Sequence, residues 1–270
     1  MFKMPEKIIY ALPEEIGNTE LFVGRKKEFD YYLGDWYYYL VNNMAQSQAI
    51  VARRKKGKTA FLQRLFNILW SCSESKVIPF YYAIQDQRIT LASFAKEFFA
   101  TFASHYLSFL TQNKDWVITP FNYATLKGHI ASYPELHMRC QSIDEFEKTG
   151  NWDLMWTVAS RAPSEIAASK GIKIVQIIDE FQNINAYIVN ERENTIDTMS
   201  GTYLILAEKR EAPLIISGSE VHGLLEIVRR LTARFKVRTL GNLPEEEAKE
   251  AIRRYAKASR TKINEQAEEK

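Results

Sequence analysis

The chain contains few of the residues that mark secreted, membrane-spanning or strongly basic proteins. Its 270 residues include only two cysteines, Cys72 and Cys140, which are too few for a disulfide framework and fit a reducing cytosol. No apolar run reaches the roughly 18 residues that a membrane-spanning helix needs, and the N-terminus has no apolar signal core. The net charge is only +3, so no overall basic field favours a nucleic-acid partner. We therefore expect a cytoplasmic protein that spans no membrane.

What the chain has in quantity is apolar sequence. Hydrophobic residues make up 46% of it, enough to bury the core of one large α/β domain with a small appendage. Strand-like and helix-like segments alternate, which is typical of a parallel sheet. Pro79 cannot donate to a strand ladder, so the second expected strand should lie near an edge of the sheet. The expected strands are residues 48–52, 77–83, 172–178, 213–217 and 235–240.

Helical periodicity fills the sequence between these strands. Residues 25–43, 91–110 and 152–170 carry apolar side chains at helical spacing, and Gly171 is a natural stop for the last of these segments. Pro163 could start a second helix within that last segment. An aromatic stripe runs along the middle segment, and we expect it to be core, because aromatic residues at helical spacing usually are. That stripe consists of Phe94, Phe98, Phe102 and Tyr106.

Two regions depart from the alternation. Residues 111–150 have mixed charge and little regularity, and we predict that they form an insertion in the main domain. His137 and Cys140 have metal-like spacing there, but without a second pair of ligands they are weak evidence for zinc. Pro244 starts a charged helical segment in which three glutamates suit the positive end of a helix. The predicted organisation is a main domain over residues 1–243 and a partial helical lid over 244–270.

Residues 52–59, Ala-Arg-Arg-Lys-Lys-Gly-Lys-Thr, form the most informative motif. Gly57 allows the backbone to approach a phosphate, Lys58 would reach the β- and γ-phosphates, and the Thr59 hydroxyl would bind Mg²⁺. Ala52 occupies the position where the usual pattern has glycine. A basic surface turn is the alternative, but the expected strand before the motif and helix after it favour nucleotide binding. The remaining predicted nucleotide-binding residues of this loop are Arg54, Lys55, Lys56 and Ala60.

An acidic pair follows the third expected strand, 120 residues after the loop. Asp179 would hold Mg²⁺ through water, and Glu180 would polarise the attacking water. A solvated Asp-Glu turn at the end of a strand is the alternative. Because the pair accompanies a phosphate-binding loop at a suitable distance, the two motifs together predict Mg²⁺-dependent binding of a nucleoside triphosphate.

Several short segments also occur in the order seen in AAA+ ATPases. They are Phe22-Val-Gly-Arg-Lys-Lys-Glu28, the phosphate-binding loop, Ile177-Ile-Asp-Glu-Phe-Gln182, Leu214-Ile-Ile-Ser-Gly-Ser219 and Leu231-Thr-Ala-Arg-Phe235. More narrowly, the chain resembles prokaryotic ATPases of the archaeal-ATPase and STAND type, relatives of the origin-recognition initiators, over roughly residues 20–260 apart from 111–150. The resemblance implies a three-layer α/β P-loop NTPase sandwich with a five-stranded, mainly parallel sheet and a short C-terminal lid.

The resemblance also implies roles for residues outside the two motifs. Val23, Gly24 and Arg25 would lie by the adenine; an ordinary glycine turn is the alternative. Ser217 or Ser219 would be a polar sensor near the γ-phosphate, unless the two form a simple Ser-Gly-Ser turn.

Arg234 stands where such families often place an arginine finger, which acts across a subunit boundary. Arg229 and Arg230 are rival candidates for the finger, and a surface arginine is the alternative for Arg234 itself. A finger would require a nucleotide-dependent homo-oligomer.

ATP and Mg²⁺ are therefore the expected cofactors, and Lys58, Glu180 and Arg234 the expected catalytic residues. The expected function is an ATP-hydrolysing switch that couples nucleotide state to assembly or to an unidentified protein partner. A non-hydrolysing interaction module is the alternative. Glu180 favours hydrolysis and Ala52 favours the module. A DNA-associated initiator or transposition helper is a third possibility, which rests on family analogy alone.

Overall fold

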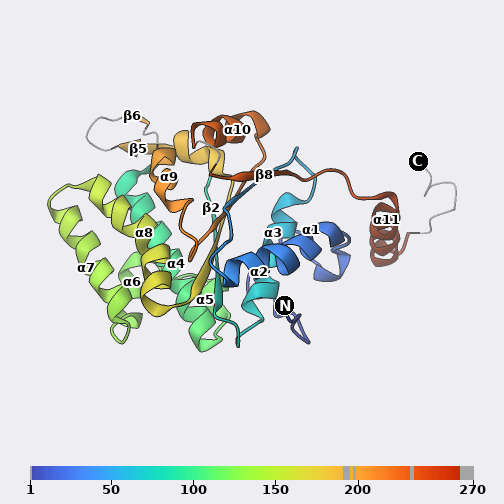
Figure 1. Ribbon diagram of the computed structural model, residues 1–270, viewed down its shortest axis with the longest axis horizontal. Coiled ribbons are helices and arrows are strands. Elements are labelled where there is room, and N and C mark those ends of the chain that lie inside the picture. Colours follow the sequence, from blue (N-terminus) through green and yellow to red (C-terminus); the bar gives the residue numbers. More distant parts are fainter. Residues whose placement is uncertain (1, 191–194, 197–198, 232–233, 262–270) are drawn as a thin grey trace.

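The computed structural model describes residues 2–190, 195–196, 199–231 and 234–261. Its centre is a five-stranded sheet with the order β2-β4-β7-β1-β8, in which every neighbouring pair is parallel (Figure 1). These strands lie where the sequence predicted them, and β2 is an edge strand, as Pro79 indicated. Their bounds are β1 Gln48–Val51, β2 Val77–Ala83, β4 Lys173–Asp179, β7 Leu214–Gly218 and β8 Lys236–Thr239.

Helices cover both faces of this sheet, giving the three layers that the sequence predicted. The helices before and after β1 lie on one side, and those between β2 and β8 lie on the other (Figure 1), as right-handed crossovers require. The first group is α1 Lys26–Asp30, a π-helical turn η2 Tyr31–Asp35, α2 Trp36–Val41 and α3 Lys58–Trp70. The longer members of the second group are α4 Leu91–Thr111, α7 Pro134–Lys148, α8 Trp152–Lys170 and α10 Val221–Arg230.

The central strands are apolar on both faces because helices cover both. Ile177, Ile178 and Ile216 are fully buried, as expected for parallel strands of an α/β protein. All five strands run in one direction, so the loops after β1, β4 and β7 emerge at the same edge of the sheet. That edge is where ligands bind in open α/β sheets, and it brings the two sequence motifs together.

Helix α4 covers the outer edge of β2 with its aromatic stripe and with one histidine. The four stripe residues are buried, which confirms that they are core. His105 of α4 is also buried, and its Nδ1 accepts a hydrogen bond of 3.3 Å from the backbone N–H of Tyr81. An edge-strand N–H that lacks a ladder partner is thereby satisfied. Burial lowers the pKa of His105 to about 3.

We predict that His105 makes stability depend on pH. Its pKa in the folded protein lies below the 6.5 of a free histidine, so its contribution is complete above pH 6.5 and is lost as the pH falls. Between pH 7.5 and 5.5 this group should lower the free energy of unfolding by about 1.4 kcal/mol, measured by urea unfolding. His105→Gln keeps an acceptor for Tyr81 and should remove this part of the pH dependence. An equally steep loss in that variant would contradict the prediction.

Several local expectations from the sequence were wrong. Helix α8 continues through Pro163 instead of restarting there; the burial of its apolar face outweighs the lost backbone hydrogen bond. The expected helix over residues 25–43 is interrupted by the π-helical turn η2. After the acidic pair, the partly polar sequence of residues 182–194 predicts a loop, but a 3-10 helix, η3 Phe181–Asn185, and the strand β5 Ile188–Asn190 lie in this part of the chain; residues 191–194 lie outside the described residues. β5 joins β3 Ile89–Thr90 and β6 Thr195–Ile196 in a small second sheet.

The region over residues 111–150 is helical throughout much of its length. Its two shorter helices pack on α4, and α7 packs on α8. These shorter helices are α5 Asp115–Ile118 and α6 Tyr123–His129. Among the described residues, no group of three or more His, Cys, Asp or Glu side chains could hold a metal ion. That this region is an insertion stays a prediction.

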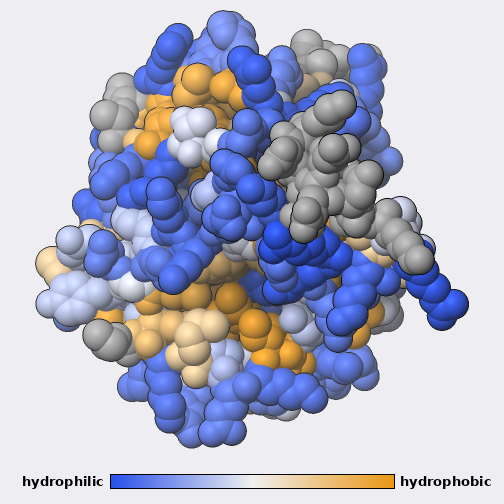
Figure 2. All heavy atoms as spheres, turned by 90° about the vertical axis from the view of Figure 1, so that its right-hand side faces the viewer, coloured by the Kyte–Doolittle hydropathy of each residue, from blue (hydrophilic) through white to orange (hydrophobic). Residues whose placement is uncertain are grey.

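The remaining described elements are short, apart from the C-terminal helix α11. Helix α11 Glu245–Ser259 buries no side chain, and the side of the molecule that carries it is largely hydrophilic (Figure 2). In the part of the chain that the structure covers, no helix is long and apolar enough to cross a membrane. The short elements are η1 Thr19–Leu21, η4 Met199–Thr202 and α9 Tyr203–Leu206.

Candidate nucleotide-binding site

The loop between β1 and α3 has the backbone that a phosphate-binding loop requires. Gly57 is left-handed, with φ of 72°, and ends the loop at the N-terminus of α3. Lys55 is also left-handed, with φ of 65°, which costs a residue with a Cβ about 1–2 kcal/mol. Ala52 is not among the residues with positive φ. Alanine therefore adds no left-handed strain at the position where the usual pattern has glycine.

The acidic pair lies directly against the start of α3. The Lys58 ammonium donates to Asp179 Oδ1 at 2.6 Å and to Glu180 Oε1 at 2.9 Å. Thr59 Oγ1 donates to Asp179 Oδ2 at 2.8 Å. The structure thus brings four of the predicted site residues within hydrogen-bonding distance of one another, although the two motifs are more than 100 residues apart.

Asp179 is the buried centre of this group, with 1% of its surface exposed. Besides Lys58 and Thr59, its carboxylate accepts hydrogen bonds from the Ser217 hydroxyl and, at 3.4 Å, from the Tyr81 hydroxyl. Ser217 is itself fully buried. The hydroxyl predicted to sense the γ-phosphate therefore lies behind Asp179 in this structure. Such a buried carboxylate needs this many partners, because an unpaired one would be costly.

Glu180 is more exposed than Asp179 and is held from two sides. Lys58 occupies Oε1, while Oε2 accepts from Gln182 Nε2 at 2.5 Å, from Ser219 Oγ at 2.8 Å and from the Ser219 backbone N–H at 3.2 Å. Burial alone would raise the pKa of Glu180, but the hydrogen bonds and the positive charge of Lys58 hold it at about 2. Glu180 is thus ionised at neutral pH, as a general base must be.

These side chains line a cavity of about 980 Å³, large enough for a nucleotide. The whole loop from Arg53 to Ala60 contributes to its wall, and so does Ser219, but Ser217 does not. Tyr255 of α11 reaches the same cavity. Arg54 and Lys55, which are exposed, and the half-buried Lys56 add positive charge at the phosphate end.

The N-terminal segment supplies Glu15 to the same cavity, although no motif in the sequence pointed to this residue. The segment is fixed on α3 by Glu14, whose carboxylate accepts from Arg64 Nε at 2.7 Å and Nη2 at 2.8 Å. Burial, and then the charge of Asp179, raise the pKa of Glu15. A third carboxylate therefore lies near the acidic pair.

Of the predicted adenine-side residues Val23, Gly24 and Arg25, none lines the larger cavity, and the last two contact the phosphate-binding loop or α11. The Arg25 guanidinium donates to the Lys56 carbonyl at 2.5 Å, and the Arg25 backbone N–H donates to Glu247 Oε2 of α11 at 2.8 Å. Gly24 has φ of 80°, and a Cβ there would overlap the Glu247 carboxylate. These contacts connect the predicted adenine-side segment to both the loop and the predicted lid.

Arg234 lies at the opposite edge of the sheet, just before β8. Its Nε is 2.7 Å from Glu208 Oε1 in an ion pair whose side chains are 33% and 55% exposed. Arg230 pairs with Glu226 one turn earlier in α10. Residues 232 and 233 of the motif around Arg234 lie outside the described residues. The structure therefore does not bring Arg234 into its own subunit's site, and its role as a finger stays a prediction.

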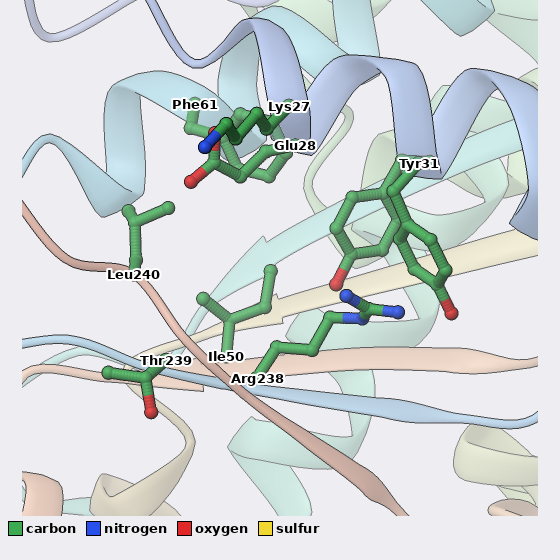
Figure 3. A pocket seen from close by; sticks show the side chains of 9 residues that line it. Lys27, Glu28, Tyr31, Ile50, Phe61, Arg238, Thr239 and Leu240 are labelled. Carbon is green, nitrogen blue, oxygen red and sulfur yellow. The ribbon is translucent and has the colours of Figure 1, made fainter. Parts of the chain in front are cut away.

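A second, smaller cavity of about 140 Å³ lies between the α1–η2 segment and the edge formed by β1 and β8 (Figure 3). The Arg238 guanidinium lies 3.2 Å from the centre of the Tyr31 ring in this cavity, and Phe61 and Leu240 are among its apolar wall residues. None of the residues predicted to bind phosphate or Mg²⁺ lines it. The residues predicted to bind phosphate and Mg²⁺ line the larger cavity instead, where the acidic pair and the loop meet.

The fold is that of P-loop ATPases. It is similar to the structure of the Walker-type ATPase PABY2304 of Pyrococcus abyssi, with a TM-score of 0.55 and 13% identity over 96% of this chain and 64% of that chain. The structure of Cdc6p from Pyrobaculum aerophilum matches with a TM-score of 0.45 and 14% identity, over 94% of this chain and 52% of that chain. The structure of the ORC2 protein of Aeropyrum pernix also matches with a TM-score of 0.45, at 13% identity over 86% of this chain and 52% of that chain.

This chain thus spans less than two thirds of the length of each of these structures. No family model and no curated protein matches the sequence.

Proposed function

We propose that the protein binds ATP with Mg²⁺ and hydrolyses it. The observation that supports this most directly is the contact of Lys58 and Thr59 with Asp179 and Glu180 at the mouth of a parallel sheet. Backbone N–H groups of the loop and the N-terminus of α3 would receive the phosphates. Lys58 would exchange the carboxylates for the β- and γ-phosphate oxygens as its partners.

The residues present fit a magnesium ion. Thr59 Oγ1 and Asp179 Oδ2 are 2.8 Å apart, and hydroxyl and carboxylate oxygens are ligands that Mg²⁺ prefers. Thr59 would bind the ion directly and Asp179 through water. The ion, when bound with ATP, would neutralise charge on the phosphates.

Glu180 is the residue suited to activate water. Its carboxylate is ionised and close to the loop, so it can accept a proton from a water that attacks the γ-phosphorus while the bond to the bridging oxygen breaks. The products are ADP and phosphate. Helix α11 contacts Arg25 through Glu247 and reaches the cavity through Tyr255. A change from ATP to ADP in the cavity would therefore alter the contacts of α11, the predicted lid. We propose that the protein is a nucleotide-dependent switch acting on assembly or on a partner.

Glu180→Gln should separate hydrolysis from binding. The amide keeps the shape of the side chain but cannot accept the proton, so turnover should fall roughly 10²–10⁴-fold while ATP affinity changes little. Phosphate release and equilibrium binding of a fluorescent ATP analogue measure the two quantities. Glu145, an exposed residue of α7, provides the matched control, and Glu145→Gln should behave as wild type.

A non-hydrolysing nucleotide-binding module is the second candidate, favoured by the fact that both oxygens of Glu180 already have hydrogen-bond partners. Equal turnover in wild type and Glu180→Gln, with intact ATP binding, would support that candidate and reject hydrolysis. Asp179→Asn should instead raise the Mg²⁺ concentration required for binding, if Asp179 serves the ion.

A further inference from the structure

The two oxygens of Glu180 have different kinds of partner. Oε1 is held by Lys58, a side chain that the phosphates of a nucleotide would attract. Oε2 is held by Ser219 and Gln182, neither of which carries a charge. Binding of ATP would therefore remove the partner of Oε1 and leave the partners of Oε2 in place.

The donors to Oε2 belong to elements that are anchored in the core. Ser219 directly follows the buried strand β7, and its backbone N–H contributes to the contact as well as its hydroxyl. Gln182 belongs to η3, which is anchored by the fully buried Phe181. The Gln182 amide occupies the space where a Cβ on Gly218 would lie. Glycine at position 218 thus makes room for the side chain that holds Glu180.

We propose that Ser219 and Gln182 are positioning residues for Glu180, and that Lys58 blocks the water-facing oxygen of Glu180 until ATP phosphates draw Lys58 away. This inference rests on the proposed ATPase function. Lys58 cannot contact a phosphate and Glu180 Oε1 at the same time. Binding of ATP would therefore free Oε1 to accept a proton from water. The hydrogen bonds from Ser219 and Gln182 to Oε2 would keep the carboxylate in one orientation. Oε1, no longer bound by Lys58, would then face the phosphate end of the cavity.

The experiment compares Ser219→Ala, Gln182→Met and Gly218→Ala with wild type. We expect kcat at pH 7.5 to fall about tenfold in each, as part of the 10²–10⁴-fold contribution of a general base. KM should stay within about twofold if the role of Ser219 and Gln182 is to hold Glu180, whereas a direct γ-phosphate contact of Ser219 would raise KM in Ser219→Ala. Ser219→Thr keeps the hydroxyl that donates to Glu180 Oε2 and should restore most of the kcat that Ser219→Ala loses. Gly218→Ala should reproduce Gln182→Met, since a methyl group at 218 displaces the same amide.

Ser142→Ala and Gln141→Met on α7 remove the same functional groups outside the cavity and should match wild type. If wild type hydrolyses ATP and Glu180→Gln does not, while the Ser219 and Gln182 variants keep the wild-type kcat, the positioning inference is overturned and the ATPase proposal stands. If wild type itself turns over no faster than Glu180→Gln, the ATPase proposal fails. A fall in kcat that Ser219→Thr does not restore would also reject the positioning role, since general loosening of the site predicts that result.

Discussion

Replacing Lys58 with alanine should abolish ATP binding and also destabilise the empty protein. Lys58 is the charge-assisted donor expected to contact the phosphates, a contact worth about 1.5–3 kcal/mol or more. In the empty site it also neutralises Asp179, which is 1% exposed. Breaking a buried ion pair by removing one partner costs about 3–5 kcal/mol. Urea unfolding should therefore show a loss of about 3 kcal/mol beside the loss of nucleotide binding.

The two effects can be separated by a second substitution. Asp179→Asn in the Lys58→Ala background removes the unpaired charge, so stability should recover in part while ATP binding remains absent. Lys148→Ala, at the exposed end of α7, is the control for loss of a lysine. Unchanged ATP affinity in a folded Lys58→Ala protein would remove the phosphate-site assignment. A Lys58→Ala protein as stable as wild type would mean that the ion pair with Asp179 contributes little.

Most of the sheet was predictable from the sequence, because its strands are continuous apolar runs. Residues 172–178, for example, carry β-branched side chains on both faces, and β4 is buried on both. Pro79 indicated an edge, and β2 is one. Parallel strands align their C-terminal ends, so the sequence alone predicts that two motifs at strand ends lie side by side.

Elements that depend on contacts distant in sequence were not predictable. Pro163 reads as a helix start, yet its place in α8 is set by burial against α4 and α7. The small sheet joins β3 and β5, which are about 100 residues apart and too short to leave a periodic pattern.

The same limit applies to the site. Lys58, Thr59, Asp179 and Glu180 belong to recognisable local patterns. Gln182 ends one of these patterns, but nothing local assigned it a role, and Glu15 belongs to none. The roles of both residues come from what the fold places next to them. The Ser-Gly-Ser turn did point to Ser219, but nothing local indicated that Ser219 contacts Glu180 and that Ser217 is buried behind Asp179.

Arg234→Ala should lower turnover by 10³–10⁵-fold if this residue is an arginine finger. Arg234 precedes β8, whose first residue is level with the first residue of β1, whereas the phosphate-binding loop follows the end of β1. The arginine is therefore at the wrong edge of the sheet for its own site and could serve only a neighbouring subunit. A head-to-tail contact of that kind is heterologous, so it would build rings or open arcs. We expect ATP-dependent self-association, with specific activity rising with protein concentration.

The ion pair between Arg234 and Glu208 provides the matched control. Exposed pairs contribute about 0–1 kcal/mol, so neither Arg234→Ala nor Glu208→Gln should alter folding much. A finger requires only the arginine, so Glu208→Gln should stay active while Arg234→Ala does not. Mixing inactive Arg234→Ala with inactive Lys58→Ala should restore part of the activity, because one mixed interface combines an intact site with an intact arginine. Full activity of Arg234→Ala in a strict monomer would leave Arg234 as a surface cation paired with Glu208.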